Sequence, residues 1–153
     1  MLQPKKINRS LDILLVEDNH GDAVLTYEAF KSCKTPVDLI RVRDGEEAML
    51  YLRKEGRYVD VRVPDLILLD LNMPKKNGLE VLKEVKSDHR LQEIPVMILT
   101  SSQSHRDTED TYEAKANFYM VKPANLDGFY EVMKYVEDIW LSSLQYRTDS
   151  EKS

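Results

Sequence analysis

Hydrophobic residues in this chain gather in short, nearly continuous runs, and longer segments between the runs mix apolar and polar residues at helical spacing. The apolar runs predict strands at Asp12–Val16, Val37–Val42, Leu66–Asp70, Val96–Leu99 and Phe118–Val121. Such continuous runs are typical of parallel strands that are covered on both faces. We therefore expect a parallel sheet buried between layers of helices.

The segments between the strands predict helices over about Asp22–Lys31, Gly45–Lys54, Leu79–Lys86, Asp107–Lys115 and Leu126–Leu144. The last of these carries a one-sided apolar stripe that includes Phe129, Met133 and Trp140. Strands alternating with helices predict an α/β fold, a doubly wound (βα)5 parallel five-stranded sheet. We expect residues 11–145 to form one domain, flanked by polar tails at residues 1–10 and 146–153.

Composition narrows the class of protein. The formal net charge of −5 argues against a general nucleic-acid binder. No apolar run approaches the ~18–20 residues that span a bilayer, and no secretory leader opens the chain. The single cysteine, Cys33, has no partner for an internal disulfide, which fits a reducing compartment. We expect a cytoplasmic protein without membrane or nucleic-acid partners.

Charged residues directly follow three of the predicted strands. Glu17 and Asp18 follow the first strand, Asp70 ends the third, and Lys122 follows the fifth. The carboxyl ends of strands in an open α/β sheet are where ligands bind, so these side chains are expected to meet. Considered separately, the acidic pair also fits a helix cap with a surface charge.

The acids and the lysine suggest a divalent metal and a phosphoryl group. Mg²⁺ takes oxygen ligands and is usually held by one or two carboxylates plus waters. Asp70 ends the most apolar strand, where burial of a carboxylate is costly unless it is paired or metal-bound. A carboxylate can attack a phosphoryl group to form an aspartyl phosphate.

Two further strand ends carry groups that suit a phosphate. Thr100 follows the fourth strand, where its hydroxyl can bond a phosphoryl oxygen, although a turn or cap threonine is an equal alternative. Lys122 supplies a point charge for a phosphate. Pro123 is a candidate for a cis peptide bond, a feature of tight turns.

These residues together resemble the receiver domain of two-component response regulators, over about Leu11–Leu141, and imply its flavodoxin-like fold. The resemblance implies that Asp70 is the phosphoacceptor, and that Asp18, Asp70 and the carbonyl of Asn72 hold Mg²⁺. Glu17 stands where an aspartate is commoner and is expected to reach the metal through water. The resemblance also assigns Thr100, Lys122 and Tyr119 to phosphoryl binding and switching, and Asn72 and Ser102 to tuning of dephosphorylation.

A finer resemblance links the chain to single-domain regulators that pair with bacterial, notably cyanobacterial, phytochromes. It rests on Asp22 after Glu-Asp-Asn, on the long Arg53–Pro64 connection, and on the segments at 70–78 and 94–100. It implies a phytochrome-type histidine kinase as partner and a homodimer. We expect the fourth helix, the fifth strand and the last helix to form the output face, with Tyr135 and Leu144 at the dimer interface.

The short polar segment after Leu144 leaves no room for an output domain, so we expect signalling through an unknown downstream protein rather than enzymatic turnover. Two alternative functions fit the sequence less well. An aspartyl-phosphate phosphatase of the haloacid-dehalogenase type needs Asp-x-Asp, whereas the chain has Asp70-Leu71-Asn72. A pseudo-receiver that never takes phosphate is disfavoured because all the expected functional positions are filled.

Overall fold

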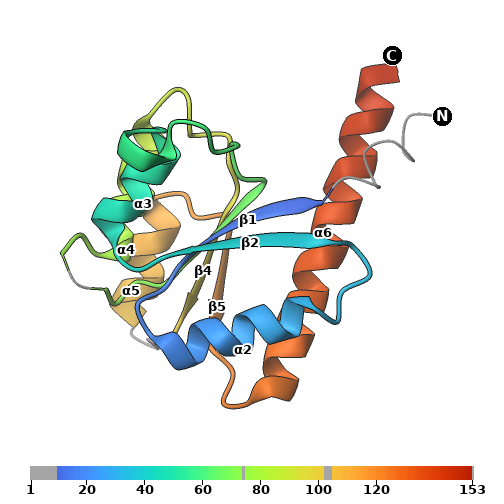
Figure 1. Ribbon diagram of the computed structural model, residues 1–153, viewed down its shortest axis with the longest axis horizontal. Helices are drawn as coiled ribbons and strands as arrows, with labels where there is room; N and C mark the ends of the chain where they lie inside the picture. The colour runs from blue at the N-terminus through green and yellow to red at the C-terminus, as the bar shows by residue number, and fades with distance from the viewer. Residues whose placement is uncertain (1–9, 74, 102–104, 153) are drawn as a thin grey trace.

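Five parallel strands form one sheet in the order β2-β1-β3-β4-β5 in the computed structural model, which describes residues 10–73, 75–101 and 105–152 (Figure 1). The strands are β1 (Leu11–Val16), β2 (Val37–Val42), β3 (Leu66–Leu69), β4 (Val96–Thr100) and β5 (Phe118–Val121). Every neighbouring pair is parallel. The predicted doubly wound α/β sheet is confirmed, and its strand positions agree within one residue at each end.

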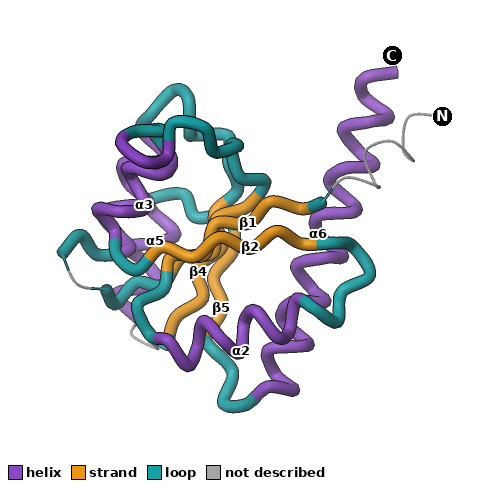
Figure 2. Tube along the Cα trace, viewed as in Figure 1, coloured by secondary structure: helices purple, strands orange, loops and turns teal. Residues whose placement is uncertain are grey.

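The helices are α2 (His20–Phe30), α3 (Gly45–Leu52), α4 (Gly78–Ser87), α5 (His105–Glu113) and α6 (Leu126–Lys152), with a 3-10 turn η1 at Gly56–Tyr58. Helices α2 and α6 lie on one side of the sheet, and α3, α4 and α5 lie on the other (Figures 1 and 2). Among the described helices, none has the length and apolar composition that crossing a bilayer requires.

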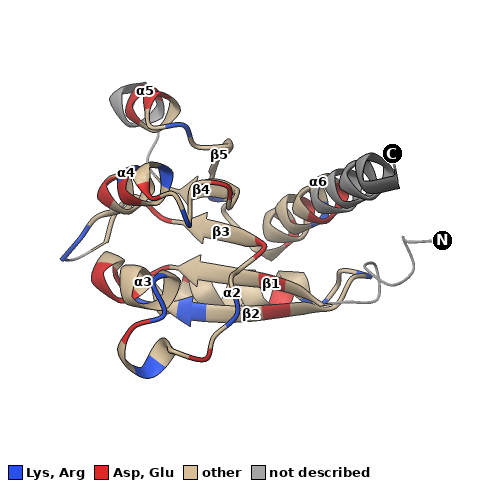
Figure 3. Ribbon diagram, turned by 90° about the horizontal axis from the view of Figure 1, so that it is seen from above, with Lys and Arg blue, Asp and Glu red and all other residues tan. Residues whose placement is uncertain are grey.

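The two faces of the sheet bury two separate apolar clusters, because successive strand residues point to opposite sides. Leu14 and Val16 of β1 face the cluster under α3 and α4, whereas Ile13 and Leu15 face the cluster under α2 and α6. Strands β3 and β4 carry no charged residue within their bounds, while β1 and β2 do (Figure 3). Burial on both faces explains why β3 and β4 read as continuous apolar runs.

Side-chain caps fix the start of three helices next to the carboxyl ends of strands. Asn19, Asp44 and Asn77 each accept a hydrogen bond from the backbone three residues on, at the first turns of α2, α3 and α4. Asn77 and Glu80 cap each other reciprocally in a capping box. These caps hold the loops that carry the candidate site residues.

The C-terminal end differs from the prediction. Helix α6 continues to Lys152, so the segment expected to be a polar tail forms the last turns of a 27-residue helix. A helix of this length spans about 40 Å, and it projects past the sheet in Figure 1. The segment is polar, but its Arg147, Glu151 and Lys152 are good helix formers, and polarity alone therefore does not end a helix.

Candidate functional site

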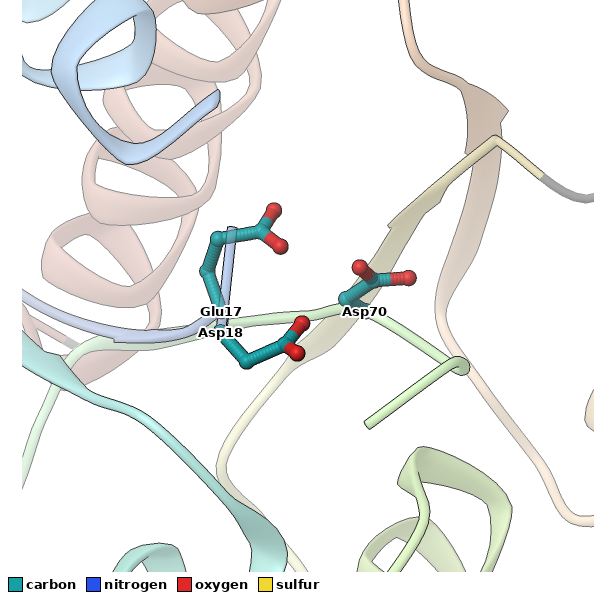
Figure 4. A group of neighbouring side chains, drawn as sticks. All are labelled: Glu17, Asp18 and Asp70. Carbon is teal, nitrogen blue, oxygen red and sulfur yellow. The ribbon is translucent and has the colours of Figure 1, made fainter. Parts of the chain in front are cut away.

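Three carboxylates meet at the carboxyl ends of β1 and β3. Val16 and Leu69 are paired in the parallel register, and the backbone N–H of Asp70 donates to the carbonyl of Val16 over 3.1 Å. Glu17 and Asp70 therefore follow paired residues of β1 and β3 and lie at the same edge of the sheet. One oxygen each from Glu17, Asp18 and Asp70 lies within 4.8 Å of the others, as the predicted metal site requires (Figure 4).

Lys122 extends to this acidic cluster from the end of β5. Its backbone N–H donates to the carbonyl of Thr100 over 2.8 Å, which fixes its position beside β4. The ammonium nitrogen then lies 2.7 Å from Glu17 Oε1, 2.8 Å from Asp22 Oδ2 and 2.9 Å from Asp70 Oδ2. The side chain of Lys122 is only 7% exposed, so its ion pairs with Glu17 and Asp70 are buried, whereas Asp22 is partly exposed.

The cluster carries more negative than positive charge. Burial raises the pKa of Glu17 to about 7; Lys122 opposes the shift, and the nearby Asp70 carboxylate adds to it. Burial also disfavours the Lys122 ammonium, but its hydrogen bonds to Asp22, Glu17 and Asp70 outweigh this effect and raise its pKa. A cation that binds the remaining carboxylate oxygens relieves the repulsion, and the donor set suits a hard divalent ion such as Mg²⁺.

Glu17 and Asp18 differ in environment although they are adjacent in sequence. Glu17 is 2% exposed; besides its contact with Lys122, its other oxygen accepts from the N–H of Asn19 over 3.2 Å. Asp18 is exposed at the mouth of the site. Because both Glu17 oxygens are already bonded, Asp18 is the more accessible direct ligand for a metal.

The loop after Asp70 is shaped by a close approach of backbones. The amide of Asn72 donates to Asp70 Oδ1 over 3.2 Å, and Gly78 N–H donates to the carbonyl of Leu71 over 3.1 Å. A Cβ at Gly78 would lie 2.2 Å from the carbonyl oxygen of Asp70, so only glycine allows this packing. The start of α4 is thereby held directly against the candidate phosphoacceptor.

Thr100 and Tyr119 lie on neighbouring strands and share a face of the sheet. Thr100 is paired with Val121, and Tyr119 with Ile98, so the two residues are diagonal neighbours across β4 and β5. Thr100 is fully buried, whereas Tyr119 is half-buried against the cluster under α3 and α4. Ser102, the other residue predicted near this strand end, lies outside the described residues.

A cleft of about 560 Å³ opens beside the carboxylates and runs toward α5. Asp18 and Asn72 line it on one side, and Asp110 and Thr111 of α5 line it on the other. The remainder of its described lining is Asn77 and three apolar residues, Leu71, Met73 and Leu79. The cleft gives solvent and small ligands access to the site from the side of α5.

The prediction of a cis peptide bond before Pro123 is wrong, because the described part of the chain contains none. The trans form is the intrinsically favoured isomer of an X–Pro bond. A Cβ at Gly128 would lie 2.4 Å from Pro123 Cβ, so the proline ring packs closely on the first turn of α6.

Two further residues contact this cluster, although the sequence predicts no role for them in the site. Asp22 in the first turn of α2 binds Lys122, and Arg41 of β2 donates to the carbonyls of Glu17 and Asp18 over 2.9 and 3.1 Å. Arg41 lies between two apolar residues, Ile40 and Val42, near the end of a predicted strand, and this position is a sequence signal that could identify it. Asp22 gave no comparable signal, because an acid in the first turn of a helix is common.

Comparisons with known proteins agree on one family. The family model of the response regulator receiver domain matches residues 13–134. Response regulator Rcp1 from Synechocystis sp. is 42% identical over 132 residues, covering 86% of this chain and 90% of Rcp1. The crystal structure of the phosphorylated cyanobacterial phytochrome response regulator RcpA is 47% identical with a TM-score of 0.83, covering 88% of this chain and 96% of RcpA. The crystal structure of the Mn²⁺-bound form of Rcp1 superposes on this chain with a TM-score of 0.80. The match covers 86% of this chain and 94% of the Rcp1 chain.

Proposed function

The chain belongs to the response regulator receiver domain family, and from this premise we propose that Asp70 accepts a phosphoryl group from a sensor histidine kinase. The observation that carries the proposal is the buried Lys122 ammonium, which joins the carboxylates of Asp70 and Glu17. A carboxylate nucleophile beside a fixed cation and metal-binding oxygens suits phosphoryl transfer, which depends on positioning and charge stabilisation.

In the proposed reaction, an Asp70 oxygen forms a bond to phosphorus while the P–N bond of the donor phosphohistidine breaks. The bonding electrons return to the imidazole nitrogen of the donor. Asp18, Asp70 and the carbonyl of Asn72 would hold Mg²⁺, with Glu17 acting through water; the ion would offset charge on the phosphoryl oxygens. The Lys122 ammonium would then replace one of its carboxylate partners with a phosphoryl oxygen. The Thr100 hydroxyl would donate a hydrogen bond to a second phosphoryl oxygen.

We propose that Asn72 and Ser102 tune the lifetime of the aspartyl phosphate by acting on the water that hydrolyses it. The position of Asn72 on the wall of the open cleft supports this role. Asn72 also replaces the second acid that a phosphatase of the haloacid-dehalogenase type needs for proton transfer. We therefore expect a phosphorylated signalling protein rather than turnover of free phosphomonoesters.

The output face in this proposal consists of α5, β5 and α6. Movement of Thr100 toward a phosphoryl group would leave space for Tyr119 to favour an inward rotamer, a shift between two existing states. Exposed apolar side chains on the same elements support an interface there, namely Tyr112, Val121 and Tyr135. We propose that this face forms an isologous homodimer and binds the unknown downstream protein. The side chain of Leu144 lies outside the described part of α6.

The partner in this proposal is a phytochrome-type histidine kinase acting in the cytoplasm. Its support is the similarity to RcpA, which is described as a cyanobacterial phytochrome response regulator. The test is phosphotransfer from such a kinase, autophosphorylated with radiolabelled ATP, to the purified chain. Rapid loss of label from the kinase and its appearance on wild type, but not on Asp70→Asn, is expected. Equal transfer to both proteins would exclude Asp70 as the acceptor.

A further inference from the structure

Arg41 is the one basic residue of β2, and it lies one residue before the carboxyl end of that edge strand. It is paired in register with Leu15, two residues before Glu17. Its half-buried side chain reaches past the end of β1, where Nε donates to the carbonyl of Glu17 over 2.9 Å. Nη2 donates to the carbonyl of Asp18 over 3.1 Å, and Nη1 lies 3.3 Å from Nδ1 of His20.

One guanidinium therefore contacts two carbonyls of the segment that links β1 to α2, and it also lies beside His20, the first residue of α2. The residues Glu17, Asp18 and Asn19 lie between the end of β1 and the first residue of α2. The orientation of the Glu17 and Asp18 carbonyls fixes the peptide planes on both sides of the Asp18 Cα, and so the direction of its carboxylate. The planar fork of arginine holds two acceptors in a fixed geometry, which the single ammonium of lysine does not reproduce.

The charge of Arg41 acts against the binding of a cation. A positive group near three carboxylates lowers the attraction of the site for Mg²⁺, so removing the charge alone would strengthen binding. Loss of the two hydrogen bonds to the turn would weaken binding, because Asp18 would no longer be held near Asp70. The two effects have opposite signs, and the sign of the measured change distinguishes them.

We propose that Arg41 is a positioning residue for the metal site: it fixes the β1–α2 turn so that the exposed Asp18 carboxylate stays beside Asp70. The expected effect of Arg41 on the affinity for Mg²⁺ rests on the proposed function. The geometric part of the inference does not depend on it, because Arg41 bonds backbone carbonyls of Glu17 and Asp18, which are not among the proposed metal ligands. Arg41 acts through Asp18 and has no contact with the reacting groups.

The experiment compares wild type, Arg41→Gln, Arg41→Lys and the control Arg43→Gln. Arg43 is exposed, lies two residues from Arg41, and contributes only its backbone N–H to the hydrogen bond with Glu47. Mg²⁺ dissociation constants are measured by calorimetry at one pH and ionic strength. Amide hydrogen exchange of residues 18–20 is measured in the metal-free proteins, and thermal unfolding checks that each variant is folded.

Both Arg41 variants should raise the Mg²⁺ dissociation constant, by about 5- to 20-fold for Arg41→Gln, which corresponds to the loss of one or two hydrogen bonds. Both should speed exchange at residues 18–20, whereas Arg43→Gln should change neither quantity by more than about twofold. Equal or tighter Mg²⁺ binding by Arg41→Gln would overturn the proposal. A lower melting temperature with unchanged affinity and unchanged exchange at these amides would overturn it too, because the role would then be only structural.

Failure of the proposed function gives a different result. If wild type binds no Mg²⁺, the metal-dependent reaction fails, but the amide exchange of the metal-free variants still decides whether Arg41 orders the turn. Faster exchange at residues 18–20 in both Arg41 variants would then support the positioning role. Unchanged exchange would overturn it.

Discussion

Lys122 and Glu17 form a buried ion pair of 2.7 Å although β3 and β4 separate the strands that they follow. The contact is possible because both side chains are long and both leave the sheet at its carboxyl edge. It ties the end of β5 to the end of β1 across Asp70, which lies between them. The candidate phosphoacceptor is therefore held from both sides by the same charge network.

Lys122→Gln should destabilise the metal-free protein, because it leaves buried carboxylates without their cation. Breaking a buried pair of this kind costs about 3–5 kcal/mol. Mg²⁺ should recover part of this loss and stabilise the variant more than wild type. Urea unfolding with and without Mg²⁺ measures both effects, with Lys134→Gln on the exposed side of α6 as the control. Equal stability of Lys122→Gln and wild type without metal would contradict the charge network.

Mg²⁺ binding should strengthen as the pH rises through about 7. Burial raises the pKa of Glu17 to about 7, so below this pH the ion must bind a site that carries an additional proton. The affinity should fall by up to about tenfold per pH unit below that point. Calorimetry of wild type and Glu17→Gln tests this, since the variant should lose the dependence. A wild-type affinity that is constant between about pH 5.5 and 8 would contradict the assignment.

The raised pKa of Glu17 also affects the stability of the metal-free protein, which should fall as the pH rises, whereas Mg²⁺ affinity should increase. Between about pH 4.5 and 7, the folded state holds a proton on Glu17 that the unfolded chain has released. The free energy of unfolding contributed by this group therefore falls as the pH rises across that window. Denaturant unfolding in the presence of a chelator measures this, and Glu17→Gln should flatten the profile.

Asp18→Ala should weaken Mg²⁺ binding more than Glu17→Ala does. Asp18 is exposed at the mouth of the site, whereas both oxygens of Glu17 are bonded to Lys122 and to the Asn19 amide. We expect a loss of about 10- to 100-fold for Glu17→Ala, the effect of removing a residue that supports a metal site without direct contact, and a larger loss for Asp18→Ala, which removes a direct carboxylate ligand. Titration of both variants under one set of conditions tests the order. The reverse order would make Glu17 the direct ligand.

Tyr135→Glu should weaken the proposed homodimer, because it places a charge on the exposed part of α6. Tyr135 is 48% exposed, and Tyr27 on α2 is a matched control at 50%. Light scattering should show a wild-type dimer, an unchanged Tyr27→Glu variant, and a dissociation constant raised at least about tenfold for Tyr135→Glu. A wild type that is monomeric both with and without a phosphoryl mimic would exclude the dimer and leave the phosphoacceptor assignment intact.

The sequence predicted those parts of the molecule that depend on burial and chain order. Apolar runs located all five strands, and the acids at the ends of β1 and β3 meet because parallel neighbours in register end at the same edge. The sequence predicts the end of α6 near Leu144 because the following residues are polar, but helix propensity carries the helix on to Lys152. The Asp22–Lys122 pair depends on packing between elements that are distant in sequence. Local patterns carry no information on such contacts.

The most direct test of the account is the intact mass of the protein after incubation with acetyl phosphate and Mg²⁺. Wild type should gain the mass of one phosphoryl group, and so should the control Asp60→Asn, whose side chain is exposed and remote from the site. Asp70→Asn should gain none, because an amide is a poor nucleophile and removes a charge from the metal site. Stoichiometric phosphorylation of Asp70→Asn under the same conditions would contradict the central claim that Asp70 is the phosphoacceptor.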